Sequence, residues 1–353
     1  MAQISAAAPS FRSSARRRSG VRRIEVRWGL MFILPWIVGF LLFGAFPMAA
    51  SLYLSFTNYS LAAKTDVGPQ WIGLTNYSKL FSLDVHTVDP GVTDASKVLA
   101  PGYTELMQVG NVVVGATDPF FWKSLRVTLL FAVIGLPSGL AMALILALLT
   151  NLPVPGVRIF RTIFYLPYVV SAVASGLIFQ QVLNRDVGWL NVLLKAVGLS
   201  GPNWLNDEAL VLPALALIGL WGVGNAMLLY LAGLQGVPTD LYEAAKIDGA
   251  NSWHRLISIT LPMISPVILY NLVIGLITVF QYFTTAYIIG GGQGNPNYST
   301  LFYNLYLYNQ AFVYTDMGYA SAMAWVLMII VLTITGIVFA TSRNWVFYAS
   351  GPK

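Results

Sequence analysis

The sequence contains no cysteine and only two histidines, His86 and His254. Without cysteine the chain can form no disulfide, no thiolate metal site and no cysteine nucleophile. The two histidines lie in separate polar segments far apart in the sequence, which argues against a metal centre built from histidine. We therefore expect neither a metal nor any other cofactor.

Charged residues are also scarce, at 10% of the chain, whereas hydrophobic residues make up 57% and the mean hydropathy is +0.68. Water-soluble domains carry about a quarter charged residues. This excess of apolar residues predicts a membrane protein. The net charge of +6 could suggest nucleic acid, but the basic residues gather in the tail 1–27 and at the ends of apolar runs, as membrane topology requires. We expect this tail to contact anionic lipid and not nucleic acid.

Two further absences limit the energy sources open to the chain. No G-x-x-x-x-G-K-[ST] loop occurs, so the chain cannot bind ATP by that device. The apolar runs lack Asp, Glu, Lys, Arg and His, residues that ion-coupled carriers usually place within the membrane. Because carbonyl and hydroxyl oxygens can hold Na⁺, an ion-coupled carrier stays an alternative. A membrane enzyme would need paired carboxylates or an activated nucleophile, and the adjacent Asp207 and Glu208 would point in different directions on a helix.

Several apolar runs approach the roughly 20 residues needed to cross about 30 Å of hydrocarbon. The six runs are about 28–56, 127–149, 162–183, 210–234, 263–289 and 319–341. They predict an all-α integral membrane protein with six transmembrane helices, whose membrane domain covers 28–343 between the tail 1–27 and the C-terminal segment 344–353. The first run could instead be a signal peptide cleaved near Pro47–Ser51, but it is longer than the usual apolar core of about 7–15 residues, which favours an uncleaved span.

The distribution of charge predicts how these spans are oriented. With the N-terminus inside, most Lys and Arg fall in cytoplasmic segments and most Asp and Glu in outer ones, so we expect both termini in the cytoplasm. The polar outer segment 57–126 is long enough to form a small structured cap. A second outer segment contains Trp189–Val197, which is apolar at helical spacing and predicts a short helix at the membrane surface.

The cytoplasmic segment between the fourth and fifth runs predicts a helix, a turn and a second helix. Asp240 and Glu243 resemble a capping box at the start of the first helix. Gly249 suits the left-handed conformation that ends a helix. Ser252 can cap the second helix, which must bend or end near Pro262.

The same segment, 236–262, is similar to the cytoplasmic signature of ABC importer permeases, which reads EAA, three residues, Gly, nine residues, Ile, one residue, Leu-Pro. The matching residues are Glu243, Ala244, Ala245, Gly249, Ile259, Leu261 and Pro262. In that family this loop forms the coupling helix that inserts into the ATPase subunit. The resemblance therefore implies a coupling role for these residues, and it implies that separate ATPase subunits hydrolyse ATP while this chain is no enzyme.

The chain as a whole resembles the carbohydrate branch of these permeases, the maltose-type, oligosaccharide and glycerol-phosphate proteins. The likeness is carried by segments 161–167, 231–235, 290–294, 306–312 and 317–323. It implies a type I ABC importer membrane domain in the bacterial plasma membrane, paired with a second permease subunit (homologous or identical), two ATPase subunits and an extracytoplasmic sugar-binding protein. A permease for a non-sugar solute stays an alternative. The stretch 84–118 departs from the family, and no role transfers to it.

A sugar crossing the membrane needs uncharged polar groups to replace its water hydrogen bonds and aromatic rings to stack on its flat apolar faces. The candidates for this path are Gln281, Asn225, Trp221, Tyr230, Tyr282, Thr284 and Thr285. On continuous helices Gln281, Thr284 and Thr285 would share one face, and Trp221 would share another with Asn225. The alternative is that these polar side chains hold membrane helices together.

Overall fold

The structure is a computed structural model that describes residues 15–62, 68–88 and 98–348. Parts of the predicted tail and C-terminal segment lie outside these residues. The chain divides into two units, Met1–Tyr53 and Leu54–Lys353, which we call the N-terminal unit and the body.

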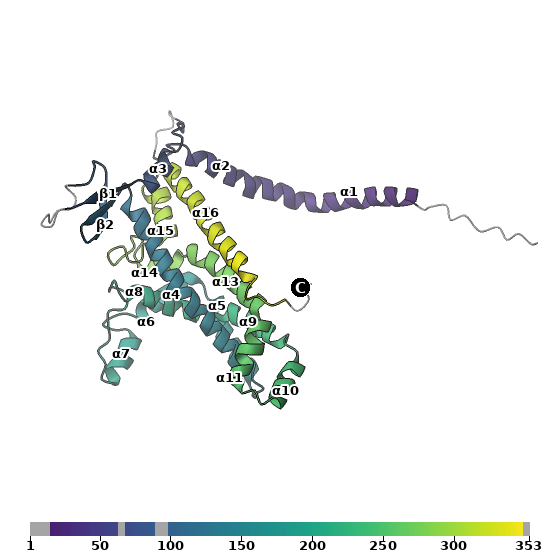
Figure 1. Cartoon of the computed structure of the whole chain (residues 1–353). Coiled ribbons are helices and arrows are strands. Elements are labelled where there is room, and N and C mark those ends of the chain that lie inside the picture. Colours follow the sequence, from purple (N-terminus) through teal and green to yellow (C-terminus); the bar gives the residue numbers. More distant parts are fainter. Residues whose placement is uncertain (1–14, 63–67, 89–97, 349–353) are drawn as a thin grey trace, which may run out of the picture. The chain divides into compact units, whose positions relative to one another are not determined.

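The elements of the structure are mostly helical (Figure 1). In chain order they are α1 (Ala15–Phe40), the π-helix η1 (Leu41–Ala45), α2 (Phe46–Ser55), α3 (Thr75–Phe81), β1 (Leu83–Thr87), β2 (Thr104–Val109), β3 (Val112–Ala116), α4 (Pro119–Thr150), α5 (Val157–Val169), α6 (Ala172–Val182), α7 (Trp189–Ala196), α8 (Val211–Trp221), α9 (Gly224–Gln235), α10 (Thr239–Ile247), α11 (Ser252–Arg255), the π-helix η3 (Leu256–Thr260), α12 (Leu261–Met263), α13 (Ser265–Phe280), α14 (Thr284–Ile289), α15 (Tyr303–Tyr308), the π-helix η4 (Asn309–Val313) and α16 (Met317–Ser342). The predicted short helix in the second outer segment is confirmed as α7.

The N-terminal unit is a helix in which α1 runs through the π-turn η1 into α2. None of its described side chains is buried, and Phe32 and Phe43 are 80% and 85% exposed. A contiguous apolar surface of this size needs lipid or another protein to cover it. The stretch Glu25–Ser55 is long and apolar enough to cross a membrane, which agrees with the first predicted span.

The body contains three more helices of spanning length among its described residues, Pro119–Thr150, Ser265–Ile289 and Met317–Ser342. Two further candidates are broken pairs: α5 and α6 meet at 99°, and α8 and α9 meet at 55°. The described residues thus offer four spans, or six if each bent pair counts as one. The third and fourth predicted spans, 162–183 and 210–234, coincide with these two bent pairs.

The prediction of an all-α protein is confirmed only in part: the described residues are mostly helical, but the 57–126 segment contains a small antiparallel sheet. The strand order is β1-β3-β2. Val109 pairs with Val112 across a two-residue turn, and Gly110 takes φ +58° at its first position, which glycine adopts readily. The structured cap predicted for this segment is therefore partly a β-sheet.

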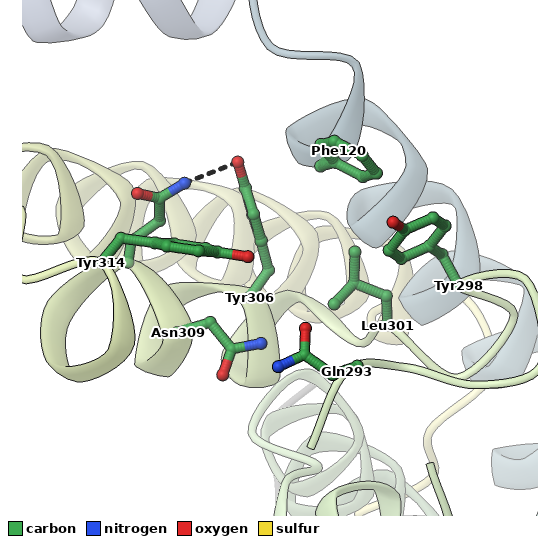
Figure 2. A pocket seen from close by; sticks show the side chains of 8 residues that line it. Phe120, Gln293, Tyr298, Leu301, Tyr306, Asn309 and Tyr314 are labelled. Atoms are coloured by element: carbon green, nitrogen blue, oxygen red, sulfur yellow. Dashed lines mark hydrogen bonds between the residues drawn. The ribbon is translucent and has the colours of Figure 1, made fainter. Parts of the chain in front are cut away.

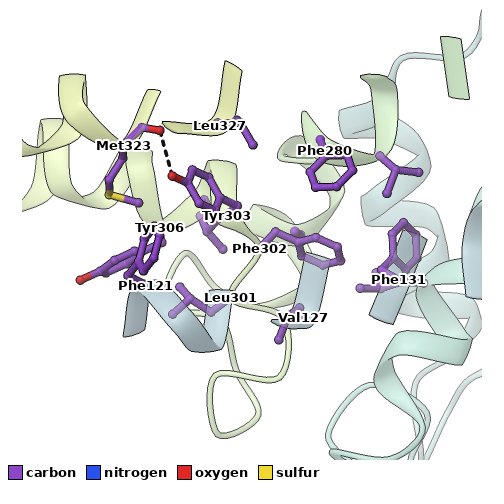
Figure 3. Packing of buried hydrophobic residues seen from close by; sticks show 14 of the residues in the cluster. Phe121, Val127, Phe131, Phe280, Leu301, Phe302, Tyr303, Tyr306, Met323 and Leu327 are labelled. Carbon is purple, nitrogen blue, oxygen red and sulfur yellow. Dashed lines mark hydrogen bonds between the residues drawn. The ribbon is translucent and has the colours of Figure 1, made fainter. Parts of the chain in front are cut away.

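The core of the body is aromatic (Figure 3). Phe121, Phe131 and Tyr303 are each at most 4% exposed. Tyr303 donates a hydrogen bond of 2.8 Å from its hydroxyl to the Met323 carbonyl, which ties α15 to α16. A buried tyrosine needs such a partner for its hydroxyl. A second apolar cluster, centred on Met227 and Leu234, packs α9 against α4 and α13.

The long helix α4, about 48 Å at 1.5 Å per residue, joins two ends of the body (Figure 1). We call them the sheet end, where β1–β3 lie and α4 and α16 begin, and the α10 end. At the α10 end, Arg161 at the start of α5 donates to the carbonyl of Thr150 at 2.7 Å. Also there, the backbone N–H of Phe347 donates to Ser265 Oγ at 2.8 Å.

Candidate functional site

The segment 236–262 forms a helix and a tight turn, as predicted. Gly249 follows α10 with φ +78°, and its N–H donates to the Lys246 carbonyl at 3.1 Å. The N–H of Ala250 donates to the Ala245 carbonyl at 2.8 Å. Together these two bonds are a Schellman motif, which requires a left-handed residue at this position. The predicted role of Gly249 in ending the helix is confirmed.

The predicted caps of this segment are wrong in detail. Pro238 occupies the N-cap of α10 with no side-chain hydrogen bond, so Asp240 lies in the first turn and forms no capping box with Glu243. Its charge still suits the positive end of the helix dipole. In the second helix Asn251, and not Ser252, is the cap, because its Oδ1 accepts from the His254 N–H at 2.7 Å.

The second half of the segment is anchored to the body. The hydroxyls of Tyr242 and Thr260 lie 2.9 Å apart and join α10 to η3. Ile259 and Leu261 pack against the apolar cluster around Met227. The signature residues thus lie in two places: the EAA residues are on α10, whereas Ile259 and Leu261 pack the end of the segment against the membrane helices.

The outer surface of α10 is exposed. None of its residues is buried, Ile247 is 87% exposed, and Trp253 on the neighbouring α11 is 67% exposed. A hollow of about 500 Å³ lies beside them, lined by Ala245, Asp248, Gly249, Ala250, Asn251, His254, Ser258 and Ile259. Exposed large apolar residues around a hollow are typical of a surface that binds another protein.

The predicted path residues lie mostly where membrane helices are interrupted. Gln281 follows α13, and Phe283 (φ −140°, ψ −64°) precedes α14. Thr284 therefore starts a new helix, and the prediction that it shares a helical face with Gln281 is wrong. Similarly, Trp221 ends α8 and Asn225 lies in α9, so the prediction that these two residues share a helical face is also wrong.

These interruptions nevertheless suit a polar path. A broken helix frees backbone groups that must find partners, and within membranes this is tolerated only inside protein or along a water-filled cavity. Gln281 and Asn225 are exposed on the body, whereas Tyr230 is 1% exposed and packs inside the cluster around Met227.

A chain of aromatic rings extends from the break between α13 and α14. Phe283 contacts Tyr287 and Tyr308, with ring centroids 5.6 and 5.0 Å apart. Tyr308 in turn contacts Phe312 at 5.1 Å. The outermost ring, Phe312, is 57% exposed.

Asp118, which the sequence reasoning missed, organises the sheet end. Its carboxylate is 6% exposed, and its Oδ1 caps α4 by accepting from the Phe121 N–H at 3.1 Å. Tyr306 of α15 donates to both carboxylate oxygens, at 2.9 and 2.7 Å, and Tyr319 of α16 donates to Oδ2. Three helices thus meet on one buried carboxylate, which we call the Asp118 cluster.

The tyrosine hydroxyls must be protonated to donate these bonds. Burial, and after it the negative charge of Asp118, raises the pKa of Tyr306 far above its usual value. The neutral hydroxyl therefore persists throughout the physiological pH range. Asp118 forms no ion pair with the lysines or arginines that the structure describes, so hydroxyls and one backbone N–H satisfy its charge.

The comparisons with known proteins agree with this architecture. Residues 119–352 match the family model described as "Binding-protein-dependent transport system inner membrane component". The chain belongs to this family. The permease is 39% identical over 340 residues to the "Probable ABC transporter permease protein YesP" of Bacillus subtilis (strain 168), covering 96% of this chain and 97% of that protein.

Two further comparisons extend the family assignment. The lactose transport system permease protein LacF of Rhizobium radiobacter is 38% identical over 241 residues, covering 67% of this chain and 80% of LacF. A crystal structure of a bacterial ABC transporter involved in the import of the acidic polysaccharide alginate has the same fold, with a TM-score of 0.67 and 23% identity over 93% of this chain and 99% of that one. The protein is therefore an ABC importer permease of the bacterial plasma membrane that crosses the membrane several times.

Proposed function

We propose that this permease moves a sugar or oligosaccharide across the plasma membrane, driven by ATP hydrolysis on separate subunits. The observation that carries the proposal is the exposed helix α10, which presents the EAA signature at one end of the body. Support for a saccharide comes from LacF, named for lactose, and from the alginate transporter of similar fold.

In this proposal, different partner proteins bind the two ends of the body. At the α10 end an ATPase subunit docks on Glu243, Ala244 and Ala245, so this end faces the cytoplasm with both termini. At the sheet end an extracytoplasmic binding protein delivers the sugar; a second crystal structure of the alginate transporter holds such a partner, an alginate pentasaccharide-bound periplasmic protein. A second permease subunit, homologous or identical, completes the path, and a second ATPase serves it. The chain itself carries no catalytic activity in this proposal.

The proposed path follows the broken helices. Gln281 and Tyr282 lie in the break between α13 and α14, and Thr284 and Thr285 begin α14. Trp221 and Asn225 lie on either side of the break between α8 and α9. Broken membrane helices present backbone dipoles and polar side chains to substrates in many transporters. Tyr230 is buried inside the body, so we do not place its side chain on the path.

Replacing path amides by leucine should slow transport without disturbing assembly. Gln281→Leu and Asn225→Leu each remove a hydrogen-bonding side chain, so we expect sugar uptake into proteoliposomes of the complete transporter to fall about two- to tenfold. Gln108→Leu, an exposed amide on β2, is the matched control and should import normally. If the two path variants fail to assemble, these side chains hold helices together; unchanged uptake would remove them from the path.

A further inference from the structure

A cavity of about 280 Å³ opens at the sheet end beside the Asp118 cluster (Figure 2). Its walls come from the start of α4, the loop 290–302, α15 and the segment after it. The lining residues are Phe120, Gln293, Tyr298, Leu301, Tyr306, Asn309, Gln310 and Tyr314. They comprise four aromatic rings, three amides and one leucine, and no lining side chain is a carboxylate, an amine or a guanidinium.

The rings form both the rim and the wall of the cavity. Tyr314, Tyr298 and Phe120 are 55%, 39% and 37% exposed, whereas Tyr306 is 6% exposed. Phe120 contacts both Tyr298 and Tyr306, with ring centroids 4.7 and 6.3 Å apart, and Figure 2 shows Tyr314 near Tyr306. Phe120, Tyr298 and Tyr306 thus form one contiguous aromatic surface along the cavity.

The wall is held in place by hydrogen bonds before any ligand arrives. Asp118 fixes the Tyr306 hydroxyl, which also accepts from Gln310 Nε2 at 2.6 Å. Asn309 donates to the Gly292 carbonyl at 2.9 Å, while its buried Oδ1 accepts no hydrogen bond among the described residues. Preorganised walls of this kind reduce the entropy that binding costs.

The backbone of the rim is strained. Tyr298 has φ +60°, a left-handed conformation that costs a residue with a Cβ about 1–2 kcal/mol. Non-glycine residues in such conformations cluster at ligand-binding sites, where the surrounding structure holds them. Here the strained residue carries one of the rings that line the cavity.

We propose that this cavity binds one uncharged sugar ring of the incoming substrate before it reaches the broken helices. The inference rests on the proposed function, because only then is the sheet end the side from which sugar arrives. Aromatic faces suit the apolar C–H faces of a sugar, and amides can both donate to and accept from its hydroxyls. The volume is just below the roughly 300–1,000 Å³ of typical ligand pockets, which suits a single ring and not a whole oligosaccharide.

The test measures sugar binding directly, because in uptake the binding protein presents the sugar first. The complete transporter in nanodiscs, without binding protein, is mixed with lactose or with other neutral disaccharides that it imports, and saturation-transfer NMR reports binding. We expect Tyr314→Leu and Phe120→Leu to weaken binding about three- to tenfold. Both residues are partly exposed, so the truncations leave the core intact.

Three control variants distinguish the cavity from the rest of the permease. Tyr314→Phe keeps the ring and should bind sugar like the wild type, as should Tyr348→Leu, a ring 59% exposed at the α10 end. Gln108→Leu should also retain binding, because this exposed amide on β2 does not line the cavity. Wild-type binding by Tyr314→Leu and Phe120→Leu, or import of a sugar that gives no binding signal, would overturn the proposal. If no neutral disaccharide is imported at all, the proposed function itself fails.

Discussion

Gly249→Val is expected to lower ATP-driven sugar uptake at least about tenfold while membrane insertion stays normal. A Cβ at this position would meet no atom within 4 Å, so space is not the obstacle. The obstacle is the backbone, since φ is +78° and a β-branched residue is a genuine outlier in that region. Releasing the strain would undo the Schellman motif and move α10 away from its docking position.

The matched control is Gly249→Asn. Asparagine adopts the left-handed conformation far more readily than valine. This variant should therefore keep the conformation of the loop and retain most of the uptake. Glu243→Lys tests docking separately, because Glu243 is exposed on α10 and its replacement leaves the fold of the loop alone. Wild-type uptake by correctly inserted Gly249→Val would remove the coupling role from this loop.

Asp118→Ala is expected to produce the largest loss of stability of any substitution at the sheet end, about 3 kcal/mol or more. Hydrogen bonds to a charged group contribute about 1.5–3 kcal/mol each, and this carboxylate accepts from two tyrosines. The substitution also removes the N-cap of α4, for about 1 kcal/mol. Thermal unfolding of the detergent-solubilised protein, followed by tryptophan fluorescence, measures the loss.

Two variants distinguish the stability contributed by the Asp118 cluster from a general effect of removing a charge. Asp84→Ala removes a carboxylate that pairs with the exposed His86 at 2.9 Å and accepts an exposed hydrogen bond from the Ala100 N–H at 2.8 Å. Because both contacts are exposed, we expect a loss of about 1 kcal/mol, smaller than that of Asp118→Ala. Tyr306→Phe removes one donor, and its effect should not add to that of Asp118→Ala, because both changes break the same bonds. Additive effects, or equal losses for Asp84→Ala and Asp118→Ala, would show that Asp118 does not organise this end.

Features set by neighbouring residues could be predicted from the sequence. Gly249 ends α10 because a left-handed position after a helix favours glycine, and α7 forms where apolar residues recur at helical spacing. The small sheet was missed although Gly110-Asn111 between two β-prone stretches is a hairpin signal. The length and polarity of the surrounding segment predicted a structured cap but did not indicate its strands.

Features set by distant residues could not be predicted. Asp118 meets Tyr306 and Tyr319 across 188 and 201 residues of sequence, and no local pattern marks the three as partners. The break after α13 falls at Gln281–Phe283, where the sequence has neither glycine nor proline, so tertiary packing must set it. The cavity at the sheet end was missed for the same reason, since its walls come from separate parts of the chain.

The proposed function requires the two ends of the body to face opposite sides of the membrane, with sugar arriving at the sheet end and ATPase docking at the α10 end. Cysteine labelling tests this orientation, because the chain has no native cysteine. Asn111→Cys, exposed in the turn between β2 and β3, and Ser252→Cys, exposed at the start of α11, are treated in spheroplasts with a membrane-impermeant maleimide. We expect Asn111→Cys to react at once and Ser252→Cys to react only after the membrane is permeabilised. Labelling of Ser252→Cys in intact spheroplasts, with Asn111→Cys protected, would contradict the orientation and both docking assignments with it.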